Sequence, residues 1–282
     1  MKRALIIVSS VLAVSWCVAA QSGGNAVFSF RTAGGAPVLG APYSASITIQ
    51  SVQTLGDGTR IEQTFSGSTA RDSQGRTRQD APLPNLGNLS AANAPHLVFI
   101  QDPVSQNSYT LNLTDKTAQK MPTAGPGSAG PSVAGVAPAP GGPGGDKFFI
   151  QMRAPAGPDP AALPPQIAIA GFAGGEDDAQ ASTENLGSQT MEGVQVNGTR
   201  TTRTIPAGQM GNDRPISIVT EVWTSPDLKT VVYSKRSDPR TGEQTFRLTN
   251  IVRADPDPAL FTVPSDFKVV DGPQPIIYSP NR

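Results

Sequence analysis

The sequence predicts a mainly β protein whose strands are antiparallel. Several segments alternate apolar and polar residues with the period of two that is typical of a half-buried strand. Turn-forming residues separate these segments at short spacing, which favours antiparallel neighbours over βαβ crossovers. No long amphipathic helical pattern follows the first 20 residues.

The N-terminal segment, residues 1–20, has the pattern of a secretory signal peptide. Lys2 and Arg3 precede an apolar run, and small residues end the segment at Ala20. The apolar run is shorter than the about 20 residues that cross a bilayer, and no later segment qualifies. We therefore expect cleavage after Ala20, export to the periplasm or beyond the cell, and no transmembrane segment in the mature chain.

Cleavage removes Cys17, the only cysteine, and leaves 20 basic against 22 acidic residues, a net charge near −2. The mature chain therefore has no disulfide and no thiol chemistry. Its charge gives no long-range attraction to nucleic acid or to an anionic membrane, so we expect no nucleic-acid partner.

The 29 glycines and 27 prolines are unevenly distributed and divide the chain. The stretch PTAGPGSAGPSVAGVAPAPGGPGGD has no aromatic residue and no charge before its last residue, so it cannot bury enough apolar surface to offset its ordering entropy. The predicted organisation is a signal peptide (1–20), an N-terminal extension (21–40), a first β block (41–121), a flexible Pro/Gly/Ala-rich insertion (122–182), a second β block of the same sheet (183–270) and a C-terminal tail (271–282).

The first block contains two clear alternating segments, YSASITIQ (43–50) and SYTLNL (108–113). Between such segments lie residues that tolerate the backbone angles of tight turns. The predicted turns are Gly56-Asp57-Gly58, Ser73-Gln74-Gly75, Asp102-Pro103, Glu192-Gly193, Asn197-Gly198 and Pro226-Asp227.

The second block predicts a three-strand meander from ISIVTEVWTS (216–225), TVVYSKRS (230–237) and EQTFRLTNI (243–251). A basic run enters the turn between the last two segments. We interpret these basic residues as solvent-facing and as protection of a sheet edge, where Lys and Arg are common.

The sequence shows no catalytic constellation and no metal site. Metal sites need several converging ligands, and the mature chain has one histidine, His96, and no cysteine. The acidic clusters 176–178 and 255–257 lack the spacing of a calcium loop and read as solvated loops. Phosphate-cradling, dinucleotide and nucleophile-elbow motifs are absent. We expect a protein that is not an enzyme and has no cofactor; a hydrolase would need carboxylates, or a serine and His96, to converge in the fold.

Longer phrases resemble LolA-like periplasmic proteins. LGSQTMEGVQVNGTRTTRTIP, EVWTSPDLKTVVYSKRSDPRTGEQTFRLTNI and DPALFTVPSDF are similar to the C-terminal half of that family, and ARDSQGRTRQD with FIQDPVSQNSYTLNLTDKTAQKMP is similar to the N-terminal half. The resemblance implies an incomplete antiparallel β-barrel, a curved sheet whose concave face can hold an acyl chain, a hydrophobic peptide or a partner protein. This chain departs from the lipoprotein carriers of the family in showing no helix to cover that face and in carrying a Pro/Gly insertion between the halves.

A curved sheet with one apolar face must cover that face with its own chain, a partner or a lipid. The residues expected to line it are Trp223, Tyr233, Phe246, Leu248, Phe99, Tyr109 and Leu111. The competing interpretation is that these are ordinary core residues. The predicted function is an exported, non-enzymatic binding module of the bacterial envelope that holds a lipid-like ligand. The alternative is a sensor or structural module that meets an envelope protein without a small-molecule ligand.

Overall fold

The structure is a computed structural model, and it describes residues 31–33, 37–82, 96–122, 128–138, 148–153, 156–158, 181–272 and 276–278 of the chain. These residues form a 12-stranded main sheet, a smaller five-stranded sheet and one 3-10 helix, η2 (Pro258–Phe261). No α-helix occurs within these ranges. The prediction of a mainly β fold is confirmed.

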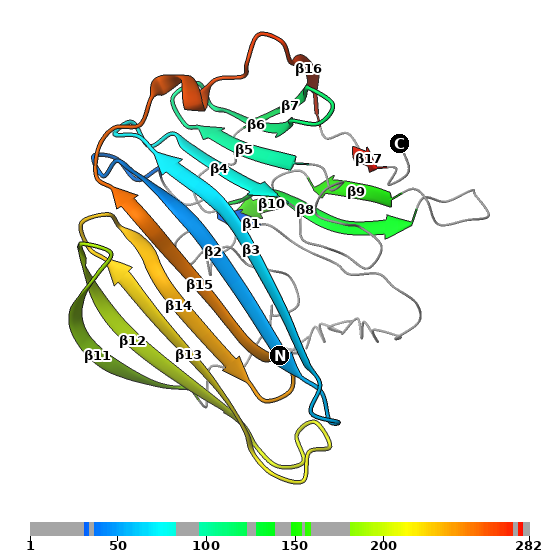
Figure 1. Cartoon of the computed structure of the whole chain (residues 1–282), viewed down its shortest axis with the longest axis vertical. Coiled ribbons are helices and arrows are strands. Elements are labelled where there is room, and N and C mark those ends of the chain that lie inside the picture. Colours follow the sequence, from blue (N-terminus) through cyan, green and yellow to red (C-terminus); the bar gives the residue numbers. More distant parts are fainter. Residues whose placement is uncertain are drawn as a thin grey trace, which may run out of the picture.

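The main sheet contains strands from both predicted blocks (Figure 1). In sheet order they are β11 (Ala181–Met191), β12 (Val194–Ile205), β13 (Ile216–Ser225), β14 (Thr230–Asp238), β15 (Gly242–Val252), β2 (Tyr43–Thr54), β3 (Arg60–Arg71), β4 (Thr77–Pro82), β5 (His96–Asp102), β6 (Asn107–Asn112), β7 (Thr117–Pro122) and β16 (Lys268–Asp271).

The two blocks meet where β15 pairs with β2. Phe246 lies directly opposite Ile49, and Leu248 lies opposite Ile47, so the apolar residues of both strands share a face. Residues about 200 positions apart in the sequence are therefore neighbours, and the core forms across this junction.

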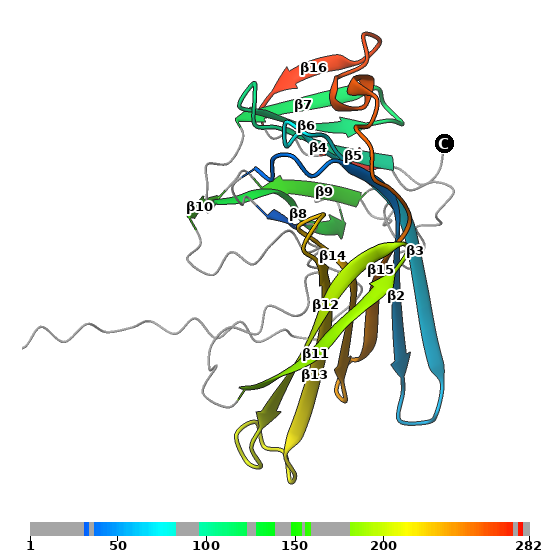
Figure 2. The same ribbon diagram turned by 90° about the vertical axis from the view of Figure 1, so that its left-hand side faces the viewer.

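The main sheet is curved and does not close into a barrel. Its two ends are β11 and β16, and Figure 2 shows β4 to β7 bent over relative to β11 to β15. Every described pair of strands is antiparallel except β16 with β7. The incomplete antiparallel barrel expected from the sequence is thus confirmed, with one parallel strand added at its end.

The smaller sheet consists of β1 (Arg31–Ala33), β8 (Ser128–Pro138), β9 (Phe148–Arg153) and β17 (Ile276–Tyr278), with β10 (Ala156–Pro158) paired to β8. Figures 1 and 2 both place β8 and β9 beside β4 and β5. Three of these strands fall inside the predicted insertion 122–182, whose flexibility stays a prediction. The predicted signal peptide and the acidic cluster 176–178 lie outside the described residues.

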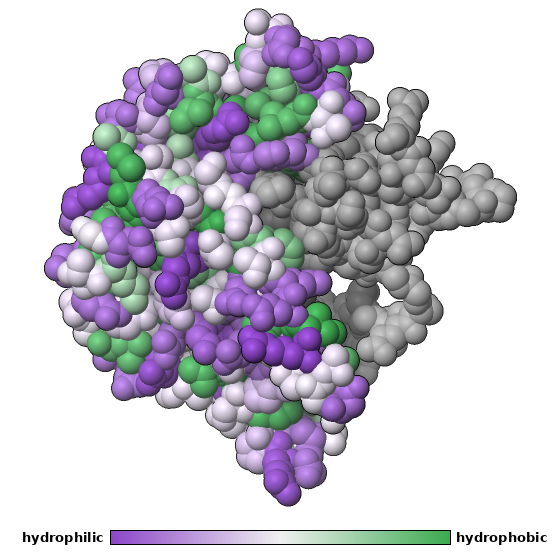
Figure 3. Space-filling view, in the orientation of Figure 1, coloured by the Kyte–Doolittle hydropathy of each residue, from purple (hydrophilic) through white to green (hydrophobic). Residues whose placement is uncertain are grey.

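The face of the main sheet that is turned toward the viewer in Figure 1 is mixed in character. Figure 3 shows hydrophilic residues over most of it, with hydrophobic groups scattered among them. Strand β3 shows the difference between the two sides of the sheet: Thr64 and Ser66 are exposed, whereas Phe65 between them is half-buried. One side of the strand therefore meets solvent, and the other side is available for packing.

The predicted meander is confirmed as β13, β14 and β15, each paired in sequence order. Turns also occur at four predicted positions in the first and second blocks, at residues 56–57, 73–74, 192–193 and 226–229, and a fifth follows Asp102. The dipeptides with Gly, Asn and Asp at these places adopt the tight geometries that they favour.

The predicted turn at Asn197-Gly198 is wrong. Both residues lie inside β12, directly opposite Thr224 and Trp223 of β13. An Asn-Gly pair signals a tight turn, but glycine is also used where another group must approach the backbone closely. The aromatic ring of Trp223 makes that approach here.

The interpretation of the basic turn as edge protection is also wrong. β14 and β15 are interior strands, flanked by β13 and β2. Arg236 and Arg240 instead form ion pairs with Asp238, whose side chain is 1% exposed. Arg240 also donates from Nε and from its backbone N–H to the Asp238 carboxylate, so the arginines hold the turn together.

Candidate functional site: an apolar surface inside the curled sheet

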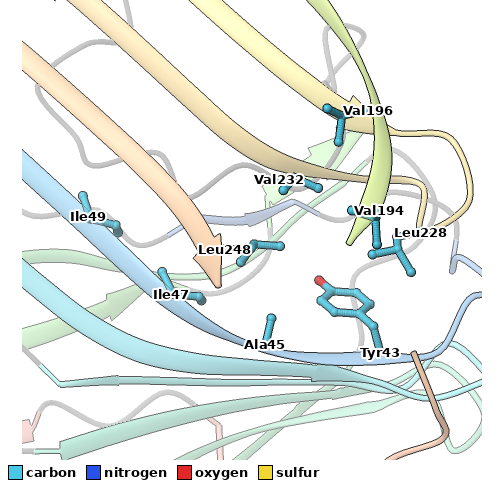
Figure 4. Packing of buried hydrophobic residues seen from close by; sticks show 9 residues of the cluster. All are labelled: Tyr43, Ala45, Ile47, Ile49, Val194, Val196, Leu228, Val232 and Leu248. Atoms are coloured by element: carbon cyan, nitrogen blue, oxygen red, sulfur yellow. The ribbon is translucent and has the colours of Figure 1, made fainter. Parts of the chain in front are cut away.

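The larger buried cluster shows how far the main sheet curls. Val194 and Val196 of β12 pack in one cluster with Tyr43 and Ala45 of β2, although β13, β14 and β15 separate these strands in the sheet. Only a sheet that bends back on itself brings them together. We call this group the inner cluster; it comprises Tyr43, Ala45, Ile47, Ile49, Val194, Val196, Leu228, Val232 and Leu248. Figure 4 shows these side chains gathered from β2, β12, β14, β15 and the turn that contains Leu228.

A row of three apolar side chains extends from the inner cluster across β3, β2 and β15. Phe65, Ile49 and Phe246 lie directly opposite one another in register. Ile49 is buried, whereas both phenylalanines are half-buried and pack against the cluster from its margin. This apolar row is therefore continuous with the core and still partly open to solvent.

The chemistry of the apolar row limits what it can do. None of its three side chains carries an ionisable or hydrogen-bonding group, so the row can contribute apolar contact and no proton transfer. Burial of apolar area is non-directional and proportional to the area removed from water. The surface therefore fits the apolar part of a ligand.

A buried arginine, Arg71 at the end of β3, connects two segments that the bend of the sheet brings together. The guanidinium of Arg71 donates from Nε and Nη2 to the carbonyl oxygen of Ala41, at 3.0 and 2.8 Å, and from Nη2 to the carbonyl oxygen of Leu228. It also lies 4.9 Å from the centre of the Tyr43 ring. Burial lowers the pKa of Arg71, but an arginine keeps its proton in proteins. The turn after β13 is thereby tied to the start of β2.

Sequence reasoning missed Arg71. It stands in ARDSQGRTRQD, a phrase that indicates only the family resemblance, and it is 3% exposed in the structure. The available signal was its position next to Asp72, at the end of an alternating strand. In the structure, Asp72 caps the turn that follows this strand. Asp72 accepts hydrogen bonds from the backbone N–H groups of Gln74 and Arg76.

The seven residues predicted to line one surface are divided between different places. Trp223, Phe246 and Leu248 belong to the inner cluster or pack against it. Tyr233 lies opposite Trp223 in register, and its ring is 5.4 Å from the guanidinium of Arg247.

The other three predicted residues lie in β5 and β6. Leu111 belongs to a second buried cluster, against which Tyr109 packs. Phe99 lies opposite Thr110, whereas its neighbour Val98 lies opposite Leu111, so Phe99 points to the other side of the sheet. These three residues are therefore not in the inner cluster, and whether any of the seven contacts a ligand stays a prediction.

The second cluster is closed by the C-terminal segment. Phe261 of η2 belongs to this cluster, whose other members are Ala70, Val98, Ile100, Leu111 and Ala118. Arg76 stacks on the Phe261 ring at 5.3 Å. Asp255, from the predicted acidic loop, accepts a hydrogen bond from the backbone of Ser73. This acidic loop therefore fastens the turn between β3 and β4.

The described residues contain no group of three or more histidine, cysteine or acidic side chains that could hold a metal ion. His96 contacts the Asp80 carboxylate through Nε2, and Arg78 lies 3.8 Å from the same carboxylate. This pairing gives His96 a structural partner at the start of β5. None of the helices within the described ranges is long and apolar enough to cross a membrane.

No family model and no curated protein matches this chain. Among solved structures, an uncharacterised conserved protein from Thermus thermophilus matches at 10% identity, covering 83% of this chain and 92% of the other, with a TM-score of 0.39. The MucA/MucB complex of Pseudomonas aeruginosa matches at 10% identity, covering 82% of this chain and 58% of the other, with a TM-score of 0.38.

A LolA superfamily protein from Nitrosomonas europaea also matches, at 10% identity over 79% of this chain and 90% of the other, with a TM-score of 0.19. The solved structures that match therefore include a member of the superfamily that the sequence phrases resemble. All three TM-scores are below 0.5, so the proposals that follow rest on the sequence and structure of this chain.

Proposed function

We propose that this protein is an exported, non-enzymatic binding module of the bacterial envelope, and that the apolar row holds an acyl chain or a similar lipid-like ligand. The observation that supports this proposal is the half-burial of Phe65 and Phe246 on either side of buried Ile49. Two partly open aromatic rings joined to a core are an apolar surface that an additional apolar chain can cover.

The expected energetics are those of apolar burial. An acyl chain gains about 0.8 kcal/mol for each CH₂ that it removes from water. Part of that gain is offset by the loss of translational and rotational freedom on binding. Because the row offers no charge, selectivity depends on chain length and shape, and a polar headgroup remains outside the row.

The proposal that the protein is exported rests on the signal-peptide pattern of residues 1–20. A module in the envelope meets lipids and lipid-modified proteins, which supply acyl chains. The absence of catalysis is part of the same proposal, since the residues of the row cannot act as nucleophile, acid or base.

Titration with 11-(dansylamino)undecanoic acid, a fluorescent fatty acid, tests the proposal. The purified mature protein should enhance the dansyl fluorescence and saturate at one site. Phe65→Ala and Phe246→Ala should each weaken binding. Phe267→Ala is the matched control, because Phe267 is also half-buried but packs against the second cluster. Equal binding by all three variants, or no saturable binding by the wild type, would contradict the proposal.

A further inference from the structure

Within the part of the chain that the structure describes, the end of the main sheet at β11 is a long edge with no strand on its outer side. Of the described strands, β11 pairs with β12 alone, through ten register pairs that begin at Ala181 and end at Met191. Figure 1 shows β11 along the outer margin of the sheet. Successive backbone groups of a strand point alternately to its two sides, so about half of the N–H and C=O groups of β11 face away from β12. Such an edge is a template for another strand.

The two ends of the sheet are protected differently. β16 is short, with four residues, and carries a charge at each end, Lys268 and Asp271. β11 has 11 residues, contains no lysine, arginine or proline, and carries a single charge, Glu184. A bulge at Asn185 and Gly187 is its only irregularity in register. Natural proteins usually block open edges with short strands, lysine or proline, so β11 lacks the usual safeguards.

A row of alternating charges begins at this edge. Glu184 on β11, Arg200 on β12, Glu221 on β13 and Lys235 on β14 lie directly opposite one another in register. Arg200 forms ion pairs with Glu184 at 3.1 Å and with Glu221 at 2.7 Å. The sign of the charge changes from each strand to the next, and the residue on the edge strand β11 is the carboxylate Glu184. The Glu184 side chain is 63% exposed.

We propose that β11 binds an extended segment of a partner protein as an added antiparallel strand, with a lysine or arginine of that segment opposite Glu184. Main-chain hydrogen bonds give such a complex its affinity, and cross-strand side chains select the register. A basic residue at this position continues the alternation of charge by one strand. This protein-binding edge is a feature separate from the apolar row.

A second copy of this chain does not fit the edge as well. β11 contains no basic residue, so a β11–β11 pair places no positive charge opposite either Glu184. The side chains of β11 are mostly polar and exposed, so two copies of the strand bring little apolar area together. The charge row therefore favours a basic extended segment.

Two fluorescein-labelled peptides, STVTKVTS and STVTEVTS, test the proposal by fluorescence polarisation at low salt. The wild-type protein should bind the lysine peptide, with a Kd below about 1 mM, about two- to fivefold more tightly than the glutamate peptide. Glu184→Lys should reverse this preference. Glu243→Lys is the matched control, because Glu243 is also an exposed strand carboxylate but lies on interior strand β15.

Two proline variants show whether the backbone edge is the binding site. Ser188 and Gln189 are adjacent, so the N–H of one faces β12 and that of the other faces the open side. The proline variant that removes an N–H facing β12 should lower the melting temperature. The proline variant that removes an N–H facing the open side should keep the melting temperature of the wild type and should no longer bind either peptide. The proposal is overturned if neither peptide binds, if Glu184→Lys leaves the preference unchanged, or if both folded proline variants bind as the wild type does.

Discussion

The indole ring of Trp223 occupies the space that a side chain at Gly198 would need. The two residues lie directly opposite each other on β13 and β12. A Cβ atom added at Gly198 would be 2.6 Å from two carbons of the ring, which is closer than nonbonded atoms approach. The ring thus covers the glycine and fixes the position of Trp223 beside the inner cluster.

Gly198→Ala should therefore displace the indole and lower the free energy of unfolding by about 1–3 kcal/mol, as overpacking of a filled site does. Urea denaturation monitored by tryptophan fluorescence measures both the loss and the change in ring environment. Gly56→Ala is the control, because nothing lies within 4 Å of its added Cβ, and it should change stability by less than about 0.5 kcal/mol. Equal stability of the two variants would show that the ring has room to move.

Leu248 and Phe246 should respond differently to truncation, although they lie two residues apart on β15. Leu248 is 2% exposed, so Leu248→Ala should lower the free energy of unfolding by about 2–5 kcal/mol. Phe246 is half-buried, so Phe246→Ala should cost less than about 2 kcal/mol and should mainly weaken binding of the dansyl fatty acid. If Phe246→Ala loses about 3–5 kcal/mol and keeps its fatty-acid affinity, Phe246 is an ordinary core residue.

Asp238 should make stability dependent on pH. Hydrogen bonds from Arg240 hold the pKa of Asp238 below its ordinary value in the folded protein. Its contribution to stability is therefore complete above the unfolded pKa of about 4 and is lost as the pH falls through the lower folded pKa. Asp238→Asn should cost about 1–3 kcal/mol at pH 7. The difference from the wild type should shrink below about pH 4, and a constant difference down to about pH 2 would contradict this role.

Arg71→Lys should weaken the connection between the start of β2 and the turn at residues 226–229. A lysine cannot reproduce the planar donors that reach Ala41 and Leu228, so a buried carbonyl loses its partner at a cost of about 1–3 kcal/mol. Hydrogen exchange of the turn at residues 226–229 should become faster. Arg60→Lys is the control, since the Arg60 side chain is 61% exposed, and it should leave both quantities unchanged.

Much of the fold can be predicted from local sequence. The alternation in YSASITIQ gives β2 because burial of one face leaves every second residue polar, and the observed burial of β2 follows that alternation from Tyr43 to Ile49. The meander follows from three alternating segments joined by short turns. Such patterns report burial and turn geometry within a few residues of the chain.

What the sequence does not contain is the pairing of distant strands. Nothing local in Phe246 or Ile49 states that they become neighbours, and the parallel pairing of β16 with β7 has no turn signal at all. The burial of Arg71 likewise depends on carbonyl groups of Ala41 and Leu228 that only the curled sheet brings to it. The sequence therefore predicts apolar residues on strands, but it does not show which of them come together in the candidate site.

The most direct test of the proposed function is native mass spectrometry of the mature protein purified from a bacterial periplasm, followed by organic extraction and lipid analysis. We expect one acyl-containing species bound per chain in the wild type and in Phe267→Ala. The adduct should be absent from the double variant Phe65→Ala with Phe246→Ala. A bare mass for the wild type, or the same adduct on the double variant, would contradict the assignment of the apolar row as a lipid-binding surface.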